Sequence, residues 1–68
     1  MSVASDLAEL STLQSQINEL LARVTNMAVR YGVTPDSAVS ADLFAAERAL
    51  ANAHRAVNRV VDVLQETS

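Results

Sequence analysis

The sequence predicts an all-α fold: an antiparallel helical hairpin that pairs with a second copy into a homodimeric four-helix bundle. Apolar residues recur at spacings of three and four along two separate stretches, which is typical of one face of a helix. The one Gly and the one Pro of the chain both lie between those stretches. Each apolar face is also wider than a single partner helix can cover.

The length of 68 residues corresponds to one helical-hairpin domain, residues 1–68. Half of the residues are hydrophobic but only 3% are aromatic, so each buried side chain removes little area from water. Domains of this size usually need disulfides, a metal or oligomerisation. With no Cys and one His, neither disulfides nor thiolate or His-cluster metal sites are expected. We expect no cofactor. Oligomerisation remains as the expected means of stabilising the domain.

The charge balance bears on the partners and on the location. The net charge is −3 and no basic run is present, so nucleic acid is an unlikely partner. No apolar run approaches the roughly 20 residues that span a bilayer, and the N-terminus lacks a signal-peptide pattern. We therefore expect a cytoplasmic protein with no membrane contact. The absence of Lys beside abundant Ala and Val suggests a small bacterial protein from a GC-rich genome.

The first helix is expected over about residues 6–31. Ser5 or Asp6 is the expected N-terminal cap, with Glu9 completing a capping box in the second case. Leu13, Leu20 and Met27 widen its apolar stripe on one side. The central positions of the stripe, at heptad spacing, are Leu7, Leu10, Gln14, Ile17, Leu21 and Val24.

Gln14 is a polar residue within this apolar stripe. A polar residue at such a position often fixes helix register and partner number at a cost in stability. The other interpretation places Gln14 at the edge of the contact. The sequence alone leaves both open.

The reversal of the chain is expected over about residues 32–40. Gly32 is predicted to end the first helix in a left-handed conformation. Thr34 and Pro35 prevent the helix from continuing. Ser40 is the predicted cap of the second helix, with Asp42 in its first turn.

The second helix is expected over about residues 41–66, with a stripe of smaller residues. Its Ala positions are predicted to form a groove for the Leu ridge of the first helix, with Ala53 at its centre and Ala51 on the outer face. Ala49, Ala56 and Val63 widen the stripe. Its central positions are Leu43, Ala46, Leu50, Ala53, Val57, Val60 and Leu64. The central positions of both helices are the predicted dimer or partner interface.

Candidate chemistry is sparse. His54 lies beside the stripe, seven residues after Glu47. It is either a pH-sensing or catalytic His held by Glu47, or a residue covering the edge of the interface. No nucleophile accompanies it, so we predict no catalytic residues and no enzyme activity.

These observations favour a non-catalytic helical protein–protein interaction module. A small dimeric adaptor, a regulator subunit and an assembly scaffold all fit. Either a second copy or a different helical protein could complete the bundle. The alternative is a ligand- or nucleic-acid-responsive regulator. It would use Arg48, Arg55 and Arg59, which form either a patch for anions or an acidic partner, or a solvated face.

Overall fold

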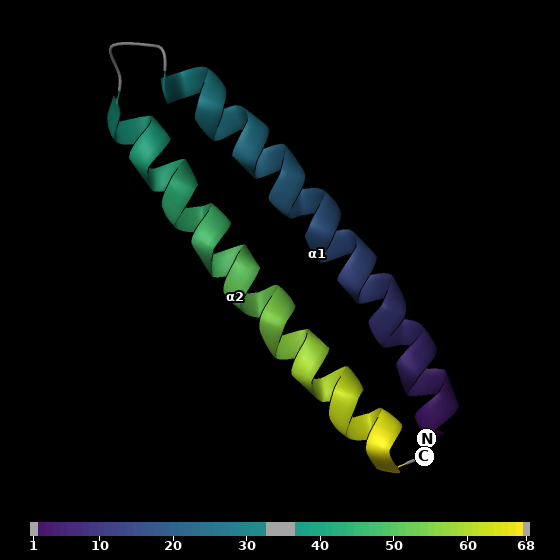
Figure 1. Cartoon of the computed structure of the whole chain (residues 1–68). Helices are drawn as coiled ribbons and strands as arrows, with labels where there is room; N and C mark the ends of the chain where they lie inside the picture. The colour runs from purple at the N-terminus through teal and green to yellow at the C-terminus, as the bar shows by residue number, and fades with distance from the viewer. Residues whose placement is uncertain (1, 33–36, 68) are drawn as a thin grey trace.

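The computed structural model describes residues 2–32 and 37–67 and consists, over those ranges, of two helices without strands. Helix α1 spans Val3–Gly32 and α2 spans Ser37–Thr67. They run antiparallel, side by side along their whole length, so α1 begins at the end of the molecule where α2 finishes (Figure 1). The Cα trace measures 51 × 15 × 14 Å. The predicted all-α fold and the helical hairpin are confirmed.

Helix α1 is capped by Ser2, not by Ser5 or Asp6 as predicted. The Ser5 N–H donates to Ser2 Oγ at 3.0 Å, and the Asp6 N–H donates to the Ser2 carbonyl at 3.0 Å. The first bond satisfies one of the N–H groups that a helix start leaves without partners, and the second is the first i→i−4 bond of the helix. Asp6 thus falls in the first turn, where its negative charge is favourable to the helix dipole.

The other end of α1 differs from the prediction at Gly32. This residue is the last of the helix, and its φ is not positive. The prediction of a left-handed terminator is therefore wrong, because the backbone keeps helical geometry through the glycine. The expected break at Thr34 and Pro35 falls outside the described residues.

Helix α2 begins at Ser37, so Ser40 is inside the helix and cannot be its N-terminal cap. The hydroxyl of Ser40 instead donates to the Ala28 carbonyl of α1 at 3.1 Å. Ser40 and Ala28 are both buried. A predicted capping residue thus serves as a contact between the two helices, and Asp42 lies beyond the first turn.

The face where α1 and α2 meet, called the seam here, contains the predicted stripe of α1. Its members become half-buried, and Ala28 is completely buried at the closed end. On α2 the large residues of the predicted stripe also lie in the seam. The half-buried stripe residues of the two helices are Leu7, Leu10, Gln14, Ile17, Leu21, Val24, Leu43, Leu50, Val57 and Leu64.

The small residues of the α2 stripe lie elsewhere. Ala46, Ala53 and Val60 are exposed. The half-buried residues Glu47, His54 and Val61 occupy the seam in their place. The predicted packing of the Leu ridge into an Ala groove is thus wrong within the hairpin. The assignment of the outer face is also reversed, since Ala51 is half-buried whereas Ala53 is exposed.

Two helices alone enclose little volume. Among the described residues, Ala28 is the one buried hydrophobic residue, and no large side chain is fully buried. Close-packed interiors form where side chains are surrounded on all sides. The hairpin therefore has a contact face but lacks a core of its own.

Candidate interaction surface

Two side-chain hydrogen bonds define the register of the helices. Gln14 Nε2 donates to Asn58 Oδ1 at 2.6 Å, and Thr25 Oγ1 donates to Glu47 Oε2 at 2.7 Å. The two bonds lie eleven residues apart on both helices. Each residue further along α1 therefore lies beside the residue one position earlier in α2. This relation gives every α1 residue a counterpart at the same height on α2.

Thr25 lies in the last third of α1 and has a hydrogen-bond acceptor on each helix. Its Oγ1 also lies 2.8 Å from the Leu21 carbonyl, so its one hydroxyl hydrogen serves either that oxygen or the Glu47 carboxylate. Glu47 is thereby engaged by Thr25. His54 lies two helical turns away from Glu47 and is half-buried at the seam. This placement favours a seam position for His54 over an acid–base pair with Glu47.

Apolar residues accumulate along one edge of the hairpin, which we call the apolar edge. On both helices each of these apolar residues immediately precedes a seam residue in the sequence. They recur along each helix at seven-residue intervals. Equivalent flanks of two antiparallel helices lie on the same side of their seam. The apolar edge comprises Leu13, Leu20 and Met27 of α1 and Ala46, Ala49, Ala53, Ala56, Val60 and Val63 of α2.

The large residues of this edge are well exposed. Leu13, Leu20, Met27, Val60 and Val63 are each 40–57% exposed to solvent. Single exposed apolar residues are common on protein surfaces, but a continuous row usually marks a binding surface. The apolar edge extends over about the middle half of the hairpin, from Met27 and Ala46 on the side of the closed end to Leu13 and Val63 on the side of the open end.

The opposite edge has a different character. Residues that immediately follow the seam positions lie there, and they include Ser11, Asn18 and Thr25 of α1 and Asn58 of α2. Phe44 of α2 is half-buried on the same edge. The hairpin is therefore amphipathic as a whole, with one largely polar edge and one apolar edge.

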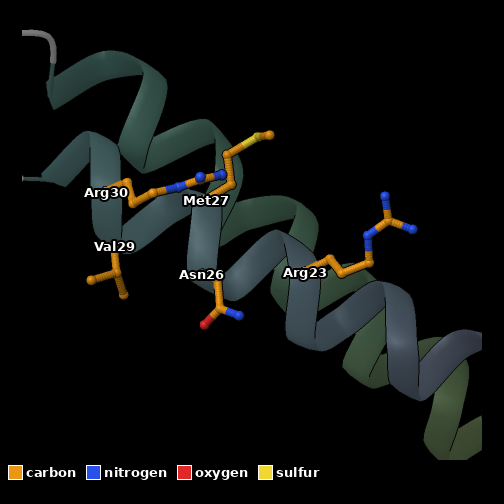
Figure 2. A pocket seen from close by; sticks show the side chains of 5 residues that line it. All are labelled: Arg23, Asn26, Met27, Val29 and Arg30. Carbon is orange, nitrogen blue, oxygen red and sulfur yellow. The ribbon is translucent and has the colours of Figure 1, made fainter.

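The surface has shallow hollows, which are open to solvent. One lies on α2 and is lined by Ala56, Arg59, Val60, Val63 and Leu64, so it belongs to the apolar edge. A second surrounds Met27 on the outside of α1 (Figure 2). In this view Met27 projects to the opposite side of the helix from Asn26 and Val29. Neither hollow has the enclosed shape of a small-molecule site.

Comparisons with protein-family models, curated proteins and solved structures find no match to this chain. Across residues 2–32 and 37–67, no group of three or more His, Cys, Asp or Glu side chains could hold a metal ion. Neither described helix contains a segment long and apolar enough to cross a membrane. The apolar edge is thus the most distinctive surface of the described structure.

The predicted site residues fall into three groups. The large stripe residues and Gln14 lie in the seam between α1 and α2, whereas Ala46, Ala53 and Val60 lie on the apolar edge. The three arginines of the predicted patch, Arg48, Arg55 and Arg59, are all exposed on α2. The Arg55 guanidinium donates to Asn52 Oδ1 on the same helix.

Sequence reasoning gave too little weight to part of this surface. The spacing predicts Leu13, Leu20 and Met27 only as residues that widen a stripe, yet they are the α1 half of the apolar edge. The seam roles of Asn58 and Glu47 were missed. The signal for Glu47 is the alternative row of three- and four-residue spacings through Ser40, Leu43, Glu47, Leu50, His54, Val57, Val61 and Leu64, and Asn58 directly follows a member of this row.

Proposed function

We propose that the protein is a non-catalytic helical interaction module, and that it binds partners through the apolar edge. The observation that carries this proposal is a set of nine aligned apolar residues, eight of them exposed and Ala56 half-buried, on a hairpin that has no core of its own. The module would act as a small adaptor, a regulator subunit or an assembly scaffold. Its partners are a second copy of the chain and other helical proteins, and its location is the cytoplasm.

The energetic support comes from the small size of the hairpin. Ordering each residue costs roughly 1–2 kcal/mol of conformational entropy, which a domain offsets mainly by burying apolar area. Here the large apolar side chains remain partly exposed even after the helices pack. Covering the apolar edge removes further area from water at about 25 cal/mol per Å². Association thus supplies the stabilisation that the isolated hairpin lacks.

The proposal is tested by a charge placed on the apolar edge. We expect Leu20→Glu to abolish association, because Leu20 is 46% exposed on that edge, and to lower helix content as the stabilisation from association is lost. Ser15→Glu is the matched control, because Ser15 is exposed and away from that edge. Light scattering over a hundredfold dilution measures the mass of each variant. Equal association of both variants would contradict a binding role for the apolar edge.

A second candidate function is a regulator that binds an anionic ligand or nucleic acid through α2. The exposure of Arg48, Arg55 and Arg59 favours it, and a dimer would double the number of arginines. Asp62 and Glu66 are exposed on the same helix and reduce the positive potential. Binding to nucleotides or duplex DNA measured at increasing salt tests this candidate. Phosphate contacts predict an affinity that falls steeply with salt, and no binding near physiological ionic strength removes the candidate.

A further inference from the structure

We infer that a second copy of this chain covers the apolar edge, related by a two-fold axis parallel to the helices. In this arrangement α1 of each copy packs on α2 of the other. The inference rests on the proposed function, commits this edge to a second copy, and adds the geometry of docking. Four properties of the apolar edge support it, namely its side-chain sizes, its hollow, its area and its charged rim.

The first property is a difference in side-chain size across the apolar edge. The α1 half carries three large residues, whereas much of the α2 half is alanine. The register places Leu20 level with Ala53 and Met27 level with Ala46, to within about one residue. One molecule therefore presents a ridge beside a trough, both running along the hairpin.

The symmetry of the pair follows from this ridge and trough. A two-fold axis parallel to the helices exchanges the two halves and preserves height, so Leu20 of one copy meets Ala53 of the other. An axis across the helices would place Leu20 against Leu20 and Ala53 against Ala53. Two opposed ridges would hold the alanines apart and leave a void, which costs stability. The parallel axis fills the trough and is favoured.

The hollow on α2 fits the same arrangement. Ala56, Val60, Val63 and Leu64 line it together with Arg59, and Leu13 is level with this part of α2. The parallel axis brings Leu13 of the second copy to this height. An aliphatic side chain of a partner thus enters an apolar hollow that is already present on the surface.

The extent of the surface also fits a second hairpin. The hairpin is 51 Å long and 15 Å wide in its Cα trace. The apolar edge occupies residues 13–27 of α1 and 46–63 of α2, which is about half of that length, and it spans the breadth of both helices. A single peptide helix would leave part of this two-helix area exposed, whereas a second hairpin presents two helices to it.

Charges at the rim agree with a self-complementary contact. Arg30 of α1 is level with Asp42 of α2, and both are exposed. Figure 2 shows Arg30 on the outer surface of α1 beside Met27 of the apolar edge. The parallel axis brings Arg30 of each copy toward Asp42 of the other. Opposite charges at matching heights favour this alignment over a shifted one.

Cysteine crosslinking tests the geometry, because the native chain has no Cys. Leu20→Cys and Ala53→Cys are made as separate variants, mixed and oxidised. We expect a disulfide-linked heterodimer from the mixture and little crosslinking of either variant alone. Mixtures of Ser15→Cys with Ala53→Cys should give no product. In the unmodified protein, a mixed isotope-labelled sample should show intermolecular contacts between the methyl groups of Leu20 and Ala53.

The possible outcomes separate the inference from the proposed function. Crosslinking of Leu20→Cys with itself, or Leu20-to-Leu20 methyl contacts, would show a dimer with the axis across the helices and overturn only the geometry. A wild-type protein that stays monomeric but binds another helical protein through the apolar edge would overturn the second copy as partner. A monomer that binds nothing through this edge would overturn both proposals.

Discussion

Gln14 of α1 is paired with Asn58 of α2 across the seam, with Nε2 donating to Oδ1 at 2.6 Å. Both residues are half-buried, 44 positions apart in the sequence. A shift of the helices by one turn would separate the two amides and leave their polar groups among Leu10, Ile17 and Val57. The bond therefore favours a single alignment of the hairpin, in agreement with the register role considered for Gln14.

A double-mutant cycle on this pair measures the preference. Gln14→Leu should lower the free energy of unfolding by about 1 kcal/mol, because the Asn58 amide loses its partner in a half-buried place. Changing both residues to Leu should recover most of that loss, since no amide is then left unpaired. Urea unfolding of the two single variants and the double variant supplies the coupling energy. Strictly additive effects would show that the two amides act independently.

Ala28 and Ser40 determine how closely the helices approach near the reversal. Ala28→Leu adds three carbons where the residue is completely buried, so it should cost ~1–3 kcal/mol. Ala41→Leu is the matched control on an exposed position of α2 and should change stability by less than ~0.5 kcal/mol. Thermal melts compare the two. Similar melting temperatures of the two variants would mean that the helices can move apart at Ala28 without a loss of stability.

Gly32 gives a prediction of definite sign. Its helical conformation can accept alanine, and the added Cβ would meet Ser40 Oγ at 3.4 Å, an ordinary contact distance. Alanine is the better helix former by up to about 1 kcal/mol. We expect Gly32→Ala to raise the free energy of unfolding by a few tenths of a kcal/mol up to about 1 kcal/mol, as measured by urea unfolding. A destabilisation near 1 kcal/mol would instead indicate a left-handed glycine.

The fold was predictable because its signals are local. Three- and four-residue spacings from Leu7 to Val24 identify the inner face of α1, and the positions of Gly32 and Pro35 place the reversal. The rotation of α2 was not predictable to the same degree. Two adjacent rows of residues on α2 both have helical spacing, one containing Ala46 and Ala53 and the other containing polar side chains.

The choice between these rows depends on pairings that no local pattern reveals. Hydrophobicity favours the alanine row for the seam. The structure places Glu47 and Asn58 in or beside the seam because each meets a polar partner there, Thr25 and Gln14 respectively. Once satisfied, these groups no longer penalise burial. The alanine row then becomes available to a partner, which is why the apolar edge follows from the structure and not from the spacing alone.

Ala51 and Ala53 test this rotation of α2 and the dimer together. Ala51 is half-buried beside the seam, so Ala51→Leu should destabilise the hairpin at every protein concentration, by ~1 kcal/mol or more. Ala53 is exposed on the trough of the apolar edge, so Ala53→Leu should leave dilute hairpin within ~0.5 kcal/mol of wild type. In the dimer, however, the added side chain meets Leu20 of the second copy. It should therefore weaken association by about fivefold to 150-fold, since overpacking costs ~1–3 kcal/mol and every 1.4 kcal/mol is tenfold.

Urea unfolding at the lowest usable concentration and sedimentation equilibrium at higher concentrations separate these effects. Ala45→Leu serves as the control, because Ala45 is exposed outside both surfaces, and it should change neither quantity. If Ala53→Leu destabilised the dilute protein as much as Ala51→Leu does, Ala53 would belong to the hairpin seam. If Ala53→Leu dimerised as tightly as wild type, the trough would not receive the ridge of a second copy. Loss of association with unchanged hairpin stability is the expected result, because only the contact between copies is overfilled.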